Sequence, residues 1–278
     1  MNRLILSLIL FAVPFLIQAK DPVSPVRARM QAFVKEKVIS GSVTAVATKD
    51  KILSLETVGY ADLKTKEAMR PDHLFWIASM TKPMASVCVL QLQEEGKLSI
   101  EDPVEKHLPE FKGQWMIEKR EGGKLILKRA ERAITIRDLL THTSGLANTG
   151  TPRHESTLGE LVMSYSKTPL NFEPGSKWSY SNAGINTLGR IVEVVSGIPF
   201  ADFLQKRVLD PCGMKDTTFW PTPAQAKRVA RVAGPTRPAN CSRWKCAFCP
   251  AASVTANARL TRPAACIPLW EMSLGFTR

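Results

Sequence analysis

The amino-acid sequence predicts a mixed α+β protein, and three features of the chain carry this prediction. Two β-rich runs near the N-terminus surround a polar turn at residues 49–51, the pattern of an antiparallel hairpin. A long apolar helix is expected from about residue 79, and shorter helical patterns recur through the middle of the chain. The 278 residues are 44% hydrophobic and 23% charged, an ordinary globular composition with room for one large domain or two small ones.

Residues 1–19 have the pattern of a secretory signal peptide. Arg3 gives the N-terminal region a positive charge, residues 4–17 form the apolar region, and Gln18-Ala19 provides a small residue at the expected cleavage site. An uncleaved membrane anchor is the alternative, but the run is shorter than the roughly 20 residues that a span needs, and Pro14 interrupts it. We therefore expect cleavage near Ala19, a periplasmic or secreted protein, and no stable membrane span afterwards.

The net charge of +13 is concentrated near the C-terminus. From Lys227 onward there are nine basic residues and one acidic residue, Glu271, so eight of the thirteen excess charges lie in this stretch. A nucleic-acid interface typically interleaves a basic patch with aromatic residues, and no such patch precedes this stretch. The sequence therefore does not predict nucleic acid as a partner.

The N-terminal part is expected to contain a helix and then the hairpin. Residues 22–38 carry a helical apolar stripe, and residues 42–48 and 52–59 are the two β-rich runs. Residues 60–73 are polar and rich in turn formers, which indicates a connecting segment. Residues 113–132 are rich in charged residues around a Gly-Gly pair. We interpret them as an inserted hairpin or a solvent-exposed loop, and we assign them no catalytic role.

The stretch from residue 75 to residue 82 is the centre of the functional prediction. Ser79 and Lys82 are three residues apart, so a helix that begins near Ser79 places the hydroxyl and the amine one above the other. Pro83 suits the first turn of this helix, and Gly96 suits its end. We expect four apolar residues to bury the helix: Met84, Val87, Leu90 and Leu92. A serine with a desolvated lysine on the next turn is a workable nucleophile and base.

The spacing S-x-x-K is weak evidence by itself, because it recurs at Ser164 and Lys167 and at Ser242 and Lys245. The context of Ser79 is what distinguishes it. An apolar lead-in precedes it, a long apolar helix follows it, and a second polar motif lies further along the chain.

The middle of the chain contains a helix start and a loop of polar residues. Thr135 and Asp138 fit a capping box that opens a short helix. Residues 139–146 follow with the sequence Leu-Leu-Thr-His-Thr-Ser-Gly-Leu, in which we interpret His142 and Ser144 as structural residues that shape a tight loop. Further helices are expected at residues 160–165, 183–196 and 200–209.

Tyr180 and Asn182 lie on a predicted turn directly before the helix at residues 183–196. Both side chains can point into one cleft, where a phenol can relay a proton and an amide can hold a substrate carbonyl. A tyrosine can act as a base only if its pKa falls from about 10, and a neighbouring ammonium favours the phenolate.

Together, the motifs Ser79-Met-Thr-Lys82, Leu139-Leu-Thr-His-Thr-Ser-Gly-Leu146 and Tyr180-Ser-Asn182 resemble the serine β-lactamase and penicillin-binding protein superfamily. The branch that they resemble is that of the class C β-lactamase-like hydrolases and esterases, which carry Y-x-N where class A enzymes carry S-D-N. The resemblance covers residues 22–223. It implies a β-lactamase/transpeptidase-like α/β sandwich, with an antiparallel sheet that is flanked by helices and built from both chain ends, plus a helical subdomain.

The resemblance also implies a role for each motif residue. Ser79 would be the acylated nucleophile, and Lys82 its proton acceptor or electrostatic partner. Tyr180 would be the general base that activates water, and Asn182 would bind the substrate and Lys82. The backbone N–H of Ser79 would be one oxyanion donor. No metal or organic cofactor is implied, and the substrate would be a β-lactam, a D-alanyl peptide of the cell wall or a small ester.

The chain departs from the family pattern after Asn182. The family's third motif, Lys-x-Gly or His-x-Gly on a strand that supplies the second oxyanion donor, does not occur there. Residues 234–278 instead form an irregular basic segment rich in Cys, Pro and Arg. We expect a hydrolase domain at residues 20–233 that is incomplete because its C-terminal strands are missing, followed by a segment that is read out of frame.

Two other interpretations of residues 234–278 stay open. The segment can be a genuine divergent tail, whose four cysteines would form disulfides in an exported protein. A zinc ribbon is less favoured, because such sites pair two C-x-x-C units and only one occurs. The four cysteines concerned are Cys241, Cys246, Cys249 and Cys266.

The sequence thus predicts an exported serine hydrolase that works through an acyl-enzyme and has weak or no activity as this chain. The alternative is a non-catalytic remnant or binding protein that keeps the fold and lacks the third motif. Covalent labelling of Ser79 distinguishes the two.

Overall fold

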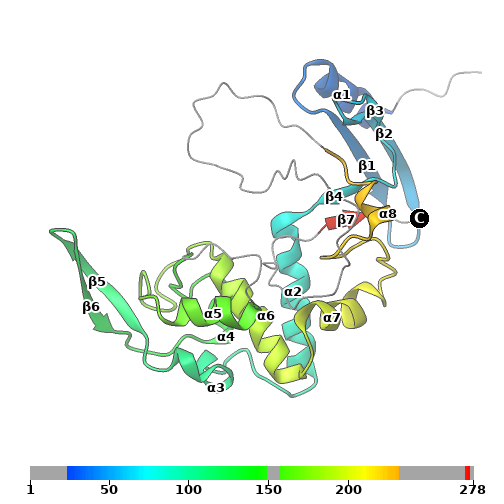
Figure 1. Cartoon of the computed structure of the whole chain (residues 1–278). Helices are drawn as coiled ribbons and strands as arrows, with labels where there is room; N and C mark the ends of the chain where they lie inside the picture. Colours follow the sequence, from blue (N-terminus) through cyan, green and yellow to red (C-terminus); the bar gives the residue numbers. More distant parts are fainter. Residues whose placement is uncertain (1–23, 149–156, 232–272, 276–278) are drawn as a thin grey trace, which may run out of the picture.

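A computed structural model describes residues 24–148, 157–231 and 273–275 (Figure 1). The expected signal peptide lies outside these residues, as does the segment 234–278 with its four cysteines, except for residues 273–275. Helices and antiparallel strands are mixed along the described chain, as the α+β prediction requires. The resemblance implied one antiparallel sheet, whereas the strands within the described residues divide into one three-stranded and two two-stranded sheets.

The N-terminal unit is a helix packed on a hairpin. Its elements are α1 (Pro25–Lys35), β1 (Gly41–Ala47), β2 (Ile52–Asp62) and β3 (Glu67–Ala68). The Ser24 side chain caps α1 by accepting a hydrogen bond from the Arg27 N–H, 3.1 Å away. β1 and β2 pair antiparallel around the predicted turn, which confirms the hairpin. β2 runs on into the expected connecting segment, because its end also pairs with β3.

Chain segments that are distant in sequence meet at β4 (Leu74–Trp76), which leads to Ser79. The Leu74 N–H donates to the carbonyl of Arg228, and the Ala230 N–H donates to the carbonyl of Leu74, both at 2.9 Å. β7 (Ser273–Gly275) pairs antiparallel with β4. The sequence predicts no strand after residue 234, and β7 shows that this prediction is wrong for residues 273–275. Three residues are too few to show a periodicity, and their pairing with β4 is a long-range contact.

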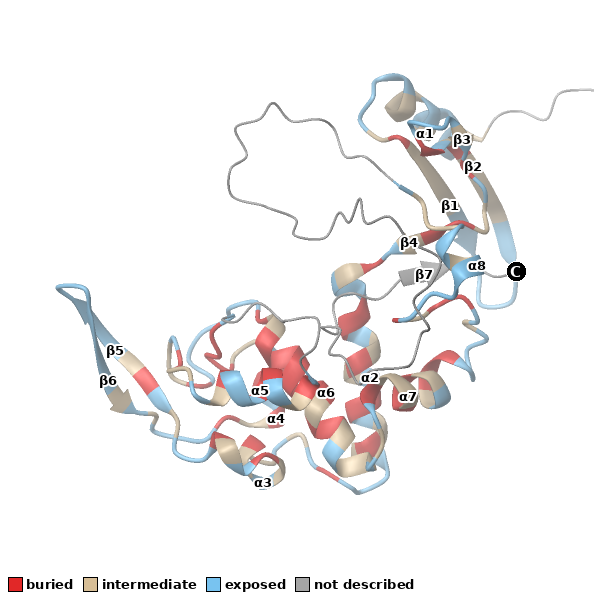
Figure 2. Cartoon of the chain, viewed as in Figure 1, coloured by how far each residue is buried: buried red, intermediate tan, exposed pale blue. Residues whose placement is uncertain are grey.

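The helical body holds the hydrophobic core, which Figure 2 shows as buried residues on neighbouring helices. Its main helices are α2 (Thr81–Glu94), α4 (Ile136–Leu140), α5 (Leu158–Ser166), α6 (Asn182–Ser196) and α7 (Phe200–Leu204). Shorter elements are α3 (Val104–His107), α8 (Pro223–Ala226) and a π turn at Gln205–Leu209. The helix predicted at residues 200–209 is therefore interrupted at Gln205. No helix in the described part of the chain has the length and apolarity that crossing a membrane requires.

The buried face of α2 differs from the expected one. Val87 and Leu90 are 42% and 41% exposed, whereas Ala85, Cys88 and Val89 are fully buried. The middle of α2 carries apolar residues on both faces, since Val87 and Leu90 are exposed while Cys88 and Val89 are buried, so its sequence does not mark which apolar face meets solvent. The positions of α6 and α7, which pack on α2, decide which residues are covered.

Residues 113–132 form the hairpin that the sequence suggested, with β5 (Trp115–Glu121) and β6 (Lys124–Arg129) pairing antiparallel. The hairpin projects from the helical body, away from the N-terminal unit (Figure 1).

Candidate active site

Ser79 and Lys82 meet at the start of α2. Ser79 lies exposed in a 3-10 turn, Ala78–Met80, and Lys82 lies in the first turn of α2 with only 6% of its surface exposed. The Lys82 Nζ donates a hydrogen bond to the Ser79 Oγ at 3.1 Å. The three-residue spacing therefore brings a buried amine onto an accessible hydroxyl.

The backbone at Ser79 is shaped by an unusual residue before it. Ala78 has a φ of +46°, in the left-handed region that costs a non-glycine residue roughly 1–2 kcal/mol. Such strain persists only where the surrounding structure holds the chain in place. The N–H groups in the first turn of a helix have no partner within it, which is the position required for a donor to a developing oxyanion.

Tyr180 lies close to both Lys82 and Ser79. The Lys82 Nζ is 4.8 Å from the centroid of the Tyr180 ring, and the tyrosine is 41% exposed. Burial alone would raise the pKa of the Tyr180 phenol, but hydrogen bonding with Lys82 and Ser79 and the charge of Lys82 lower it below its ordinary value. The shift is in the direction that a tyrosine base requires.

Asn182 begins α6, two residues after Tyr180. Its side-chain Oδ1 is buried and accepts no hydrogen bond from the described part of the chain. A buried acceptor without a donor costs about 1–3 kcal/mol, so a group that donates to this oxygen would bind favourably. Because this oxygen has no donor in the described part of the chain, the implied hydrogen bond from Lys82 to the Asn182 Oδ1 is not formed here.

Asn148 is a site residue that the sequence reasoning missed. Its Oδ1 accepts hydrogen bonds from the N–H groups of Asn182 at 2.7 Å and Ala183 at 3.1 Å. Its Nδ2 donates to the carbonyl of Tyr180 at 3.0 Å. One side chain thus holds the turn at both ends. No local pattern marks this residue, because it stands in a loop 34 positions before the turn that it binds.

His142 contacts the same turn from another side. Its ring Nδ1 accepts a hydrogen bond from the Ser181 N–H at 3.2 Å, and its carbonyl accepts one from the Ser179 N–H at 2.9 Å. Burial and the nearby charge of Lys82 lower the pKa of the His142 imidazole, so the ring is neutral at pH 7. Ser144 is buried, and its Oγ accepts from the Leu146 N–H at 3.3 Å, in keeping with a structural role.

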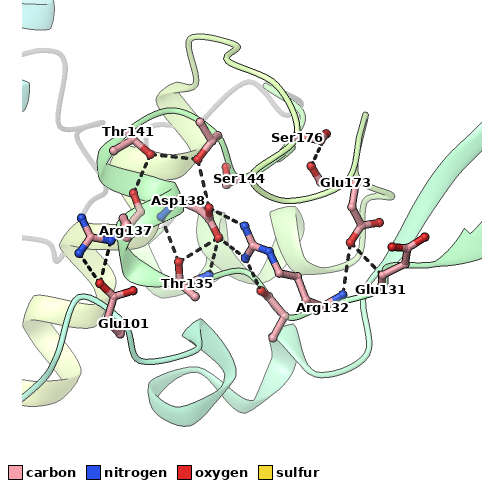
Figure 3. Close-up of polar contacts among 12 residues, drawn as sticks. Glu101, Glu131, Arg132, Thr135, Arg137, Asp138, Thr141, Ser144, Glu173 and Ser176 are labelled. Atoms are coloured by element: carbon pink, nitrogen blue, oxygen red, sulfur yellow. Dashed lines mark hydrogen bonds and ion pairs between the residues drawn. The ribbon is translucent and has the colours of Figure 1, made fainter.

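A buried carboxylate supports the loop that carries His142 (Figure 3). Asp138 is 4% exposed and receives two hydrogen bonds from Arg132, at 2.6 and 2.9 Å. The predicted capping box is confirmed, since the Thr135 N–H donates to Asp138 Oδ2 and the Asp138 N–H donates to Thr135 Oγ1. Thr143, next to His142, donates its hydroxyl to Asp138 at 3.1 Å. Asp138 therefore joins the start of α4 to the loop beside Tyr180.

The other S-x-x-K pairs have no comparable surroundings in the described structure. The Ser164 hydroxyl donates to the carbonyl of Leu161 within α5, at 2.6 Å. Ser242 and Lys245 lie outside the described residues. Among residues 24–148, 157–231 and 273–275, no group of three or more His, Cys, Asp and Glu side chains is arranged to hold a metal ion.

A mixed α/β architecture with a Ser–Lys pair beside a tyrosine defines the class of β-lactamase-like and transpeptidase-like serine hydrolases. The chain belongs to the Beta-lactamase family, whose profile matches residues 26–260. Within that family it falls with the class C β-lactamase-like and penicillin-binding protein-like serine hydrolases.

Three similar proteins illustrate the relationship. Esterase EstB of Burkholderia gladioli is 34% identical over 202 residues, which is 67% of this chain and 48% of the esterase. Penicillin-binding protein 4* of Bacillus subtilis (strain 168) is 30% identical over 203 residues, 70% of this chain and 41% of that protein. The structure of EstCE1, a hydrolase with promiscuous acyltransferase activity, matches with a TM-score of 0.63 and 28% identity, covering 74% of this chain and 54% of that one. The chain spans about half the length of the curated relatives it matches.

Proposed function

We propose that this chain carries the acyl-transfer centre of a serine hydrolase, with Ser79 as nucleophile. The observation behind the proposal is that the buried Lys82 Nζ lies near both groups, 3.1 Å from the Ser79 Oγ and 4.8 Å from the centroid of the Tyr180 ring. One lysine can therefore act on both the nucleophile and the candidate base.

The proposed reaction has two steps. In the first, the Ser79 Oγ attacks the substrate carbonyl while Lys82 relays its proton to the leaving-group oxygen, and the bond to the leaving group breaks as the acyl-enzyme forms. In the second, the Tyr180 phenolate takes a proton from water and the water oxygen attacks the acyl carbonyl, after which the bond from the acyl carbon to the Ser79 Oγ breaks and the Tyr180 phenol returns the proton to that oxygen. Asn182 would accept a hydrogen bond through its unpaired Oδ1 from a hydroxyl or amide N–H elsewhere in the substrate, since an ester group has no donor of its own.

We propose a carboxylic ester as the preferred substrate. The similarity to an esterase and to the hydrolase EstCE1 favours this class. Met80 and Trp178, which neighbour Ser79 and Tyr180 in the chain, are 66% and 65% exposed and offer apolar surface to an acyl or alcohol group. A β-lactam and a D-alanyl peptide are the other substrates that the family implies, and they serve as comparison compounds.

A non-catalytic binding protein of the same fold is the second candidate. It is favoured by the absence of Lys-x-Gly or His-x-Gly in the sequence after Asn182. Loss of one oxyanion donor typically lowers the rate by about 10² to 10³. We therefore expect slow turnover by this chain, and covalent labelling is a more sensitive assay than steady-state hydrolysis.

The deciding experiment is labelling with a fluorophosphonate probe, followed by hydrolysis of p-nitrophenyl butyrate, nitrocefin and a D-alanyl-D-alanine peptide. We expect labelling of wild type, none of Ser79→Ala, and unchanged labelling of Ser164→Ala, whose serine has the same S-x-x-K spacing. Equal labelling of Ser79→Ala would refute the assignment. An unlabelled but folded wild-type protein would favour the binding protein.

We also propose export of the protein, on the strength of the positive start and apolar run at the N-terminus. Mass spectrometry of protein recovered from a secreting host would show a mature N-terminus near Lys20. Recovery of the intact Met1 terminus from the cytoplasm would contradict this proposal.

A further inference from the structure

The hairpin of β5 and β6 has two chemically different faces. Alternate residues of a strand point to opposite sides, so Leu125, Leu127 and Arg129 share one face of β6. Their partners across the ladder are Arg120, Ile117 and Trp115, respectively. This apolar face thus carries two aliphatic residues of β6, an isoleucine and a tryptophan of β5, and one arginine on each strand.

The apolar face is open to solvent. Trp115, Leu125 and Leu127 are 45%, 47% and 38% exposed, and Figure 2 shows the outer part of the hairpin as exposed. Arg129 stacks on Trp115, with its guanidinium carbon 4.0 Å from the ring centroid. A two-stranded ribbon is marginally stable in water unless a hydrophobic face packs on something. The face therefore has the composition of a contact surface.

The base of the hairpin is fixed to the helical body, so the exposure of its outer part is not the fraying of a loose loop. Met116 is buried. The Ile117 N–H donates to the carbonyl of Leu170, and the Leu170 N–H donates to the carbonyl of Trp115, both at 2.8 Å. The Gln114 side chain donates to the carbonyl of Ser166, the last residue of α5, at 3.1 Å. The hairpin is a supported projection.

The charge of the hairpin indicates the kind of partner. Between residues 115 and 129 there are five basic side chains and two acidic ones, a net charge of +3. Glu121 is already paired with Lys119, at 2.9 Å. Two copies that met through this face would bring Arg120 and Arg129 of each against those of the other, and like charges in contact are destabilising. The charge therefore favours an anionic partner over a second copy.

We propose that the apolar face of the β5–β6 hairpin docks on an anionic lipid surface. Leucine, isoleucine and tryptophan side chains enter the interface between headgroups and acyl chains, and basic residues at their margin bind anionic headgroups. The exposed apolar side chains and basic residues of the hairpin match this pattern. The proposal is independent of the proposed hydrolysis, because the hairpin contributes none of the residues assigned to the reaction.

The test is sedimentation of the full chain with vesicles, either equimolar phosphatidylglycerol and phosphatidylcholine or phosphatidylcholine alone. We expect wild type to partition onto the anionic vesicles and to be released by 0.5 M NaCl. The double variant Leu125→Ser, Leu127→Ser is expected to partition about tenfold or more weakly, because each buried methylene contributes to interfacial binding. Arg120→Gln, which removes a charge from the docking face, should lose about fivefold on the anionic vesicles only.

A matched control is Val46→Ser with Leu53→Ser, two exposed apolar residues of the N-terminal hairpin, 43% and 55% exposed. The control should sediment like wild type, and circular dichroism should show all variants folded. Three outcomes overturn the proposal: no sedimentation of wild type, equal sedimentation of the leucine variant, or equal binding to both vesicle types. A lipid-free dimer that the leucine substitutions dissociate also overturns it and identifies a second copy as the partner.

Discussion

The His142 ring lies against the Tyr180 ring, with centroids 4.7 Å apart and planes inclined by 35°. His142 also adopts a φ of +60°, and its ring and carbonyl bind the N–H groups on both sides of Tyr180. The histidine that we interpreted as shaping a loop therefore also positions the candidate base. Because Nδ1 accepts a hydrogen bond, the proton of the neutral ring is on Nε2.

We predict that His142→Ala lowers kcat about tenfold or more while KM changes less, because a base displaced by about 1 Å loses much of its efficiency. The measurement is the steady-state kinetics of ester hydrolysis, with Thr141→Ala as the control in the same loop. Unchanged kcat in His142→Ala would show that the ring contact does not position Tyr180.

The pKa of Tyr180 should depend on Lys82. Since hydrogen bonding and charge from Lys82 lower the phenol pKa, Lys82→Met should raise it. The chain has three tyrosines, so ultraviolet difference titration of wild type, Lys82→Met and Tyr180→Phe can isolate the Tyr180 signal. An identical Tyr180 titration in wild type and Lys82→Met would contradict the predicted coupling.

Asn148→Ala should impair both stability and activity, because the side chain holds the carbonyl of Tyr180 and two N–H groups at the start of α6. We expect a loss of about 1–2 kcal/mol in the free energy of unfolding, as for a helix cap, together with a fall in kcat. Thr222→Ala removes the cap of α8 and should affect stability alone. A fall in kcat for the Thr222 variant as large as that for Asn148 would argue against a specific role of Asn148.

Asp138→Ala should destabilise the protein by roughly 2–3 kcal/mol, because it removes a capping box and charge-assisted hydrogen bonds. Glu101→Gln is the control, since solvent screens its exposed ion pair with Arg137, and the loss should be much smaller. Urea unfolding of both variants measures the difference. Equal losses of unfolding free energy in the two variants would mean that the burial of Asp138 does not increase its contribution to stability.

Lowering the pH should remove the contribution of Asp102 to the free energy of unfolding. Burial raises the pKa of this carboxyl, but hydrogen bonds from Lys106, Ser99 and His107 lower it to about 2. A carboxyl with a depressed pKa stabilises the fold above its unfolded value, near 3.9, and this contribution is lost as the pH falls toward 2. Asp102→Asn should therefore be less stable than wild type at pH 7, and the difference should narrow below pH 4. A constant difference from pH 7 to pH 3 would contradict this assignment.

The sequence by itself was sufficient for the local structure and for the family. The hairpin at residues 49–51, the capping box of Thr135 and Asp138 and the helix start before Ala183 are decided by nearby residues, so short patterns predict them. Ser79 and Lys82 belong to the same group, because one helical turn brings them together.

Tertiary structure alone decided what depends on contacts between distant segments. The covered face of α2 follows from where α6 and α7 pack, since apolar residues occupy both its buried and its exposed face. The pairing of β7 with β4 joins segments that lie far apart in the sequence, Leu74–Trp76 and Ser273–Gly275. Asn148 and His142 acquire their places beside Tyr180 only when a loop folds back across more than 30 residues. Local patterns encode the hydrogen bonds of one turn or hairpin, whereas long-range packing selects among faces and partners that those patterns leave equivalent.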